Sequence, residues 1–185
     1  MSETRKQPIV SVFGGATPRP DTPVYVLARR LGELLAHAGW TVATGGYGGV
    51  MEGVSRGAAE AGGHVIGVTC SYLEARWPQR HPNAWVQTEI RLPTLRERMA
   101  YLVECCDAAL ALPGGVGTLS EIALVWALLQ AGEIASKPLV VIGPEWGRIF
   151  EVFLATTQPY LRPGDASLLQ SVATVEAAVE LIGRH

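Results

Sequence analysis

Short runs of apolar residues alternate along this chain with longer segments whose apolar residues recur every three or four positions. The short runs have the length and continuous apolar character of buried parallel strands, whereas the longer segments have the periodicity of amphipathic helices. The predicted strands cover residues 9–13, 40–44, 64–69, 108–112 and 139–142, with weaker candidates at 86–90 and 167–172. The predicted helices cover residues 24–38, 50–61, 94–106, 118–131, 146–157 and 175–182.

The order of these elements predicts the fold class. Strands that alternate with helices through short links form a parallel sheet with right-handed crossovers. We therefore predict an α/β fold, a doubly wound parallel sheet in a three-layer αβα arrangement. One domain is expected over residues 9–185, after a disordered polar tail at residues 1–8. Residues 70–83 interrupt the alternation, and we expect them to form a mobile surface loop that carries ligand contacts or closes as a lid.

Three of the predicted strands end in glycine-rich turns, at Gly14, Gly45 and Gly114. In an open parallel sheet, ligands bind outside the carboxyl ends of the strands. The three turns are therefore expected to line one crevice. Glycine lets a bulky ligand approach the backbone closely, and free N–H groups at a helix start favour negative charge. The pattern indicates a nucleotide.

The third turn contains the candidate acid. Thr118 has the side chain of a helix N-cap, and Glu121 follows three residues later, which is the spacing of a capping box. The alternative is a catalytic carboxylate that faces the crevice. The spacing alone favours the capping role, because capping boxes are common. A second capping box is predicted at Thr94 and Glu97.

Arg98 is the candidate cation. It borders the apolar stripe of the predicted helix 94–106, so its side chain could lie over apolar surface with its charge in water. The functional alternative is a guanidinium that points into the crevice. Arg91 and Arg96 are nearby, and we expect both to be solvated.

Composition and charge indicate which partners and which cellular compartment to expect. An apolar content of 48% with only 17% charged residues suggests a buried subunit interface, and a net charge of −2 gives no footprint for nucleic acid. Three cysteines form no disulfide framework, which favours a reducing compartment. With no visible signal peptide and no apolar run of the roughly 18 residues that span a membrane, we predict a cytoplasmic protein without membrane contact. No His/Cys cluster has metal-ligand spacing.

Several enzyme classes are disfavoured. The first turn, 14–16, is not Gly-x-Gly-x-x-Gly, and no acidic residue ends the second strand, as a dinucleotide site requires. Neither Lys6 nor Lys137, the only lysines, follows a glycine turn, which excludes a P-loop NTPase and leaves lysine decarboxylase chemistry without a suitable lysine. No serine lies in a Gly-x-Ser-x-Gly context.

Residues 113–121 match the PGGxGTxxE signature of the LOG family, the cytokinin riboside 5′-monophosphate phosphoribohydrolases. The resemblance extends over nearly the whole chain: residues 45–51 are similar to a second glycine motif, and Arg98 corresponds to the arginine of a third. Two positions depart from the family pattern, because Met99 replaces a lysine and Arg96 replaces a histidine.

The resemblance implies a Rossmann-like fold and a homodimer with the site near the interface. It also implies catalytic roles for Arg98 and Glu121. For Glu121 this replaces the capping role that the spacing alone favours. The residues expected to hold the substrate and its phosphate are Gly14, Gly45, Gly46, Gly114, Gly115, Gly117 and Thr118. The expected reaction hydrolyses a purine nucleoside 5′-monophosphate, of AMP or N6-modified adenosine type, to free base and ribose 5-phosphate, without a cofactor. The alternative is a non-catalytic carrier of a nucleotide or of molybdenum cofactor.

Overall fold

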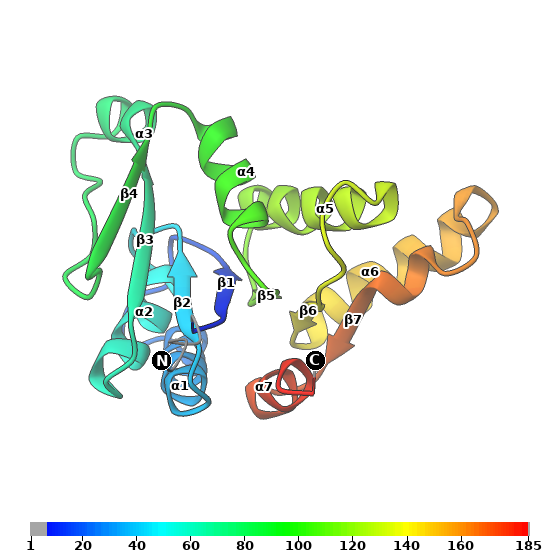
Figure 1. Ribbon diagram of the computed structural model, residues 1–185, viewed down its shortest axis with the longest axis horizontal. Coiled ribbons are helices and arrows are strands. Elements are labelled where there is room, and N and C mark those ends of the chain that lie inside the picture. Colours follow the sequence, from blue (N-terminus) through cyan, green and yellow to red (C-terminus); the bar gives the residue numbers. More distant parts are fainter. Residues whose placement is uncertain (1–6, 185) are drawn as a thin grey trace, which may run out of the picture.

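A single parallel sheet organises the computed structural model, which describes residues 7–184. Over these residues the sheet has seven strands in the order β4-β3-β2-β1-β5-β6-β7 (Figure 1). The strands are β1 Ile9–Phe13, β2 Thr41–Thr44, β3 Val65–Cys70, β4 Thr88–Leu92, β5 Ala108–Ala111, β6 Leu139–Ile142 and β7 Leu169–Val172. The chain runs outward from β1 to β4 and then returns to the centre at β5, so the order reverses between β1 and β5. Such a reversal opens a crevice at the carboxyl ends of the strands.

Helices cover both faces of the sheet. One layer contains α1 Pro23–His37, α2 Val50–Glu60 and α7 Val175–Ile182. The other contains α4 Leu95–Glu104, α5 Val116–Ala131 and α6 Pro144–Thr157. A short helix, α3 Ser71–Arg76, follows β3, and two 3₁₀ turns, η1 Gln158–Tyr160 and η2 Asp165–Leu168, precede β7.

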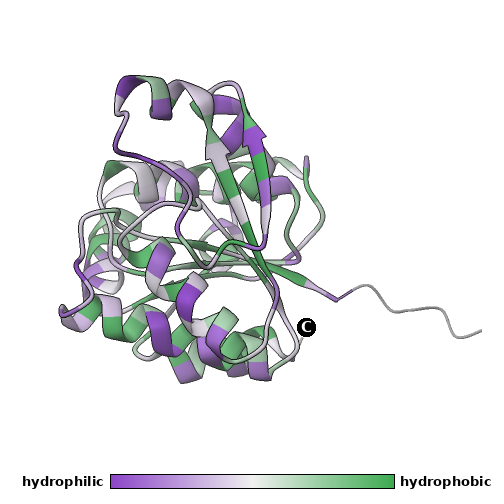
Figure 2. Cartoon of the chain, turned by 90° about the vertical axis from the view of Figure 1, so that its left-hand side faces the viewer, coloured by the Kyte–Doolittle hydropathy of each residue, from purple (hydrophilic) through white to green (hydrophobic). Residues whose placement is uncertain are grey.

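The core consists of two apolar layers, one on each face of the sheet. The alternation along β1 shows the division, since Val10 and Val12 belong to one layer and Phe13 belongs to the other. Ser11, the polar residue between them, is buried, and its hydroxyl donates to the Leu102 carbonyl at 2.6 Å. Figure 2 shows hydrophobic residues concentrated along the strands and on the helix sides that face them.

The predicted fold class is confirmed, and most element boundaries lie within two residues of the prediction. Two predictions need correction. Residues 70–83 are not a loop throughout, because Ser71–Arg76 form α3. Helix α5 begins at Val116 rather than at Thr118, which changes the geometry of the glycine turn before it. The tail predicted for residues 1–8 lies mostly outside the described residues. Within residues 7–184, no helix combines the length and hydrophobicity needed to cross a bilayer.

Candidate functional site

A cavity of about 450 Å³ lies at the carboxyl ends of the central strands and brings the three glycine turns together. Of the nine residues predicted for the site, seven line it: Gly14, Gly45, Arg98, Gly115, Gly117, Thr118 and Glu121. Gly46 and Gly114 are not among its lining residues. The backbone at Gly46 has a φ of +76°, which favours glycine, and its carbonyl accepts from the Asn83 N–H. A Cβ at Gly114 would lie 2.2 Å from the Thr118 hydroxyl oxygen, so this glycine permits close packing behind the turn.

Backbone hydrogen bonds join the three turns to one another. The Gly15 N–H donates to the Pro113 carbonyl at 3.1 Å, and the Gly15 carbonyl accepts from the Val50 N–H at 2.8 Å. Close packing requires glycine on both sides of this connection. A Cβ at Gly14 would lie 2.2 Å from Val50 Cγ1, and one at Gly49 would lie 2.4 Å from the Gly15 carbonyl oxygen. The first turn is therefore fixed between the other two.

The start of α5 supplies unpaired N–H groups to the cavity. Gly115 is the N-cap, and the first hydrogen bond of the helix runs from the Leu119 N–H to the Gly115 carbonyl at 3.0 Å. The N–H groups of residues 116–118 consequently have no acceptor within the helix. At Gly115 and Gly117 a Cβ would meet no atom within 4 Å, so the space next to these amides is open. A helix start of this kind is suited to bind a phosphate.

The capping box predicted at Thr118 and Glu121 is wrong. Because α5 begins two residues earlier, Thr118 is its third residue, and the N-cap receives no side-chain hydrogen bond. The second predicted capping box is confirmed at the start of α4. Thr94 Oγ1 accepts from the Glu97 N–H at 3.2 Å, and Glu97 Oε2 accepts from the Thr94 N–H at 3.0 Å.

Glu121 lies in the second turn of α5, lines the cavity and is only 8% exposed. Its Oε1 is 3.6 Å from Nη1 of Arg98. Burial raises the pKa of this carboxyl from 4.5 to about 7, because desolvation outweighs the opposing attraction of the Arg98 charge. Near neutral pH the side chain can therefore exchange a proton, as a general acid or base must.

Arg98 is buried, with 6% of its surface exposed, and main-chain carbonyl groups accept hydrogen bonds from its guanidinium. Its Nε donates to the Val68 carbonyl at 2.8 Å and its Nη2 to the Gly45 carbonyl at 3.1 Å. A Cβ at Gly45 would lie 1.7 Å from Nη2, so only glycine leaves room for the guanidinium. Arg98 thus lies in the crevice and not over the helix surface, whereas the neighbouring Arg91 and Arg96 are exposed.

Sequence reasoning expected ligand contacts from residues 70–83 but named no site residue among those that form one wall of the cavity. Tyr47, Trp77 and Arg80 line it from the turn after β2 and from the segment after α3. The Tyr47 hydroxyl accepts from the Cys70 N–H at 2.8 Å, and the Tyr47 ring centroid is 5.6 Å from Cζ of Arg98. Only the aromatic and basic content of residues 70–83 signalled this wall, because no spacing rule applies to an irregular segment.

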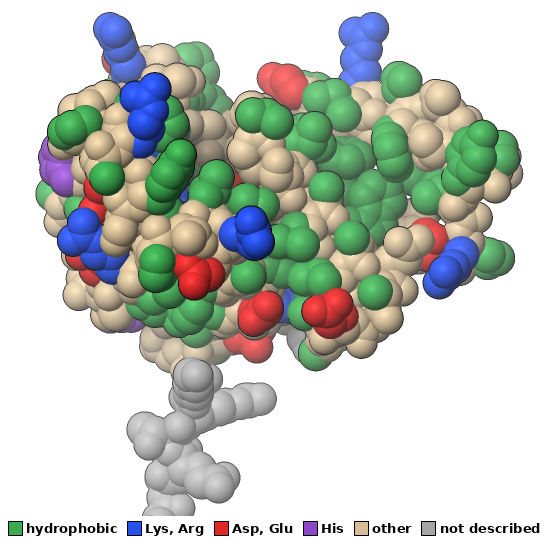
Figure 3. Space-filling view, turned by 90° about the horizontal axis from the view of Figure 1, so that it is seen from above, with side chains coloured by type: hydrophobic (Ala, Val, Ile, Leu, Met, Phe, Trp, Pro, Cys, Tyr) green, Lys and Arg blue, Asp and Glu red, His purple; other side chains and the backbone are tan. Residues whose placement is uncertain are grey.

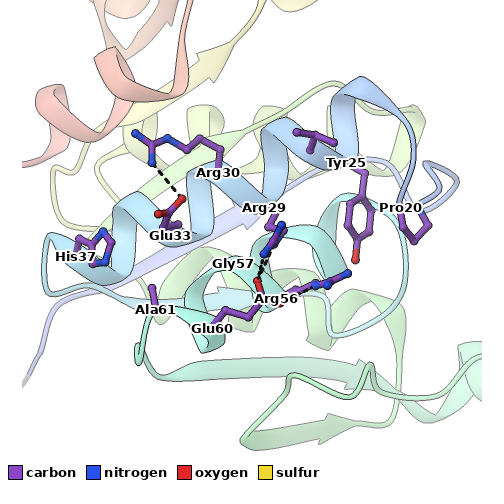
Figure 4. A pocket seen from close by; sticks show the side chains of 11 residues that line it. Pro20, Tyr25, Arg29, Arg30, Glu33, His37, Arg56, Gly57, Glu60 and Ala61 are labelled. Atoms are coloured by element: carbon purple, nitrogen blue, oxygen red, sulfur yellow. Dashed lines mark hydrogen bonds and ion pairs between the residues drawn. The ribbon is translucent and has the colours of Figure 1, made fainter.

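A second, larger hollow of about 540 Å³ lies between α1 and α2 and is lined by charged residues (Figure 4). Glu60 bonds Arg29 at 2.6 Å and Arg56 at 2.9 Å, and Glu33 pairs with Arg30 at 3.1 Å. Each of these arginines is therefore neutralised by a neighbour. The glycine turns, the helix start and the buried carboxylate all lie at the smaller cavity, to which we assign the chemistry.

Comparison with known proteins places this arrangement in a family. The model of the SLOG cluster4 family matches residues 7–135. A Mycobacterium tuberculosis protein named cytokinin riboside 5′-monophosphate phosphoribohydrolase is 33% identical over 139 residues, which are 75% of this chain and 71% of that protein.

Two similar solved structures carry a different description. The molybdenum cofactor binding protein of Rippkaea orientalis has a TM-score of 0.76 and 27% identity, with 98% of each chain covered. The molybdenum cofactor carrier protein of Chlamydomonas reinhardtii has a TM-score of 0.73 and 28% identity, covering 97% of this chain and 98% of that one.

The family match spans most of the chain and includes all three glycine turns, and the LOG resemblance predicted from residues 113–121 agrees with the named relative. The chain therefore belongs to the SLOG cluster4 family.

Proposed function

We propose that this protein is a phosphoribohydrolase that cleaves the N-glycosidic bond of a purine nucleoside 5′-monophosphate to free base and ribose 5-phosphate. One observation carries the proposal: a single buried carboxylate, Glu121, lies in the same cavity as an open helix start suited to phosphate. Both groups belong to α5, which fixes the acid relative to the phosphate site. The name of the mycobacterial relative supports the same reaction class.

The reaction requires a negative charge near the sugar. When the bond between C1′ and the base nitrogen breaks, the electron pair leaves with the base and the sugar becomes an oxocarbenium-like cation. An ionised Glu121 stabilises that cation by electrostatics. It then accepts a proton from the water whose oxygen bonds to C1′, while the departing base takes up a proton from solvent. No other carboxylate lines the cavity within residues 7–184.

We assign Arg98 a positioning role. Two of its nitrogens are bound to main-chain carbonyls, and a third faces Glu121 at 3.6 Å. This arrangement orients the carboxylate and leaves the amides of residues 116–118 to hold the phosphate. Met99, which replaces the lysine of the family pattern, does not line the cavity.

The rival function is a non-catalytic carrier of a nucleotide or of molybdenum cofactor. The specific observation in its favour is the near-complete overlap with a structure described as a molybdenum cofactor binding protein. Both functions require an anion at the start of α5. They differ in whether Glu121 acts on the bound molecule.

We further propose that a second copy of this chain covers part of α5 and α6. Helix α5 is apolar on all sides, yet Val116 is 82% exposed and Leu119 is 40% exposed, and on α6 Ile149 and Phe153 are also exposed. Figure 3 shows hydrophobic side chains gathered over the half of the molecule that contains these helices. An exposed patch of this kind indicates an interface, and the homodimer implied by the LOG resemblance would cover it. Sedimentation at several protein concentrations tests the assembly.

The decisive experiment for the reaction is a product assay. The protein is incubated with AMP, N6-isopentenyl-AMP, GMP and IMP, and free base and ribose 5-phosphate are quantified by chromatography. Adenosine and guanosine serve as substrates without phosphate, and Glu121→Gln serves as the protein control. We expect base release from at least one monophosphate, and none from the nucleosides. Tight binding of nucleotides without release of base from any of them would favour the carrier.

A further inference from the structure

The two arginines that line the cavity differ in what they bind. Arg98 donates hydrogen bonds to the Val68 and Gly45 carbonyls and forms an ion pair with Glu121. Arg80 has no such partners: within residues 7–184, no oxygen accepts a hydrogen bond from its guanidinium and no carboxylate lies within 4 Å of it. The cavity therefore contains one cation whose charge and donors are all available to a ligand.

Arg80 is nevertheless held in a defined place. Its Cζ lies 4.6 Å from the centroid of the Trp77 ring and 5.8 Å from that of the Tyr47 ring. The backbone is also fixed, because the Arg80 N–H donates to the Trp77 carbonyl at 2.8 Å. A guanidinium that lies over an aromatic ring can still donate hydrogen bonds, because its N–H groups point outward in the plane of the guanidinium.

Arg80 comes to the cavity from the β3 side of the sheet, whereas the phosphate site lies on the β5 side. Arg80 and Trp77 follow β3, whereas the open helix start follows β5, and β2 and β1 lie between these strands. Three strand spacings separate β3 from β5 by about 14 Å. If the phosphate binds at the start of α5, as the proposed function requires, the base extends toward β3 and meets Arg80.

We propose that Arg80 reads the base and selects a 6-oxopurine nucleotide, with guanine or hypoxanthine, over an adenine nucleotide. A guanidinium only donates hydrogen bonds, and its two parallel N–H groups match two adjacent acceptors. A 6-oxopurine presents O6 and N7 as such a pair, whereas adenine presents one acceptor, N7, beside the N6 amino donor. The inference rests on the proposed position of the phosphate, and it replaces the AMP-type substrate expected from the LOG resemblance with a 6-oxopurine nucleotide at the same site.

Binding measured apart from turnover tests this selection. In the Glu121→Gln background, calorimetry with GMP, AMP and ribose 5-phosphate compares the parent protein with Arg80→Ala. We expect the parent to bind GMP more tightly than AMP. Arg80→Ala should weaken GMP binding by at least about fivefold and up to about a hundredfold. Affinity for ribose 5-phosphate, which lacks a base, should change less than about twofold.

Two further variants separate geometry from charge and from packing. Arg80→Lys keeps the charge but loses the paired donors, so we expect the preference for GMP to stay lost. Arg76→Ala is the matched control, because Cζ of Arg76 lies 5.5 Å from the Trp77 ring but the residue does not line the cavity. It should leave all three affinities unchanged.

Three results would overturn the inference. Equal affinity of the parent for GMP and AMP would show that no selection exists. Equal weakening of GMP and ribose 5-phosphate by Arg80→Ala would assign Arg80 to the phosphate. Full recovery of GMP binding in Arg80→Lys would reduce its role to charge. An Arg80-dependent preference for GMP in a protein that releases no base would uphold the inference while the hydrolase proposal fails.

Discussion

Replacing Glu121 by glutamine should make the protein more stable at alkaline pH and strongly reduce its activity. The pKa of Glu121 is raised from 4.5 to about 7, so between these values the folded protein holds a proton that the unfolded chain has lost. Stability of the wild type therefore falls as the pH rises from 4.5 to 7. Well above pH 7 the penalty reaches at most about 3 kcal/mol, and glutamine, which has nearly the same shape and no charge, removes it.

The assay is thermal and urea unfolding of the wild type and Glu121→Gln at pH 4.5 and pH 8.5, at one fixed protein concentration because assembly contributes to apparent stability. At pH 8.5 the variant should melt up to roughly 6–12 °C higher, since 1 kcal/mol corresponds to about 2–4 °C in a chain of this size. At pH 4.5 the two proteins should be nearly equal. Base release should fall by at least about a hundredfold, the loss expected for a general base.

A variant of an exposed carboxylate provides the control. Glu133 is exposed just beyond the end of α5, and Glu133→Gln should change neither the melting temperature nor base release. If Glu121→Gln is less stable than the wild type at pH 8.5, the carboxylate is a structural partner of Arg98 and the reasoning fails. A gain in stability with activity retained would refute only the catalytic role.

Three further predictions follow from the geometry of the site. Gly45→Ala should reduce activity as strongly as Arg98→Ala does, because its Cβ would lie 1.7 Å from the guanidinium. Steady-state kinetics compare the two variants. Full activity of Gly45→Ala would contradict the fixed position of Arg98. In Gly117→Ala the added Cβ would enter open space beside the amides, so the free energy of unfolding should stay the same or rise by up to about 1 kcal/mol. Competitive inhibition by ribose 5-phosphate should weaken. Unchanged inhibition would show that the phosphate binds elsewhere. In the wild type, base release should rise about tenfold per pH unit up to about pH 7 and then level off, because only ionised Glu121 acts; a rate that falls over this range would make Glu121 a general acid.

The limits of sequence reasoning are clearest at the start of α5. Periodicity located the helix, but it gave no means to decide between Thr118 and Gly115 as the N-cap, because glycine is also accepted there. The start of the helix at Val116 rather than Thr118 moves Glu121 from the first turn, where it would cap its own helix, to the second turn, where it lines the cavity. Boundary errors of this size are normal for helices, yet here the boundary determines the role of the acid.

The alternation of strands and helices predicted the sheet well, because buried strands and amphipathic helices leave a periodic record. The segment that contains Trp77 and Arg80 shows no such periodic pattern. Arg80 contacts Tyr47, which lies 33 residues earlier in the chain, and Trp77 contacts Arg80 in turn. Local spacing contains no information about such a contact.

The hydrogen bonds through Gly15 also bear on protein design. The amide of this residue is bonded to the third glycine segment and its carbonyl to the second, so each of these two segments has a backbone hydrogen bond to the first. Transplanting the signature of residues 113–121 alone into another α/β scaffold should therefore yield a misshapen and inactive loop. A successful graft would need all three segments together, moved as one cassette with their spacing across the central strands preserved.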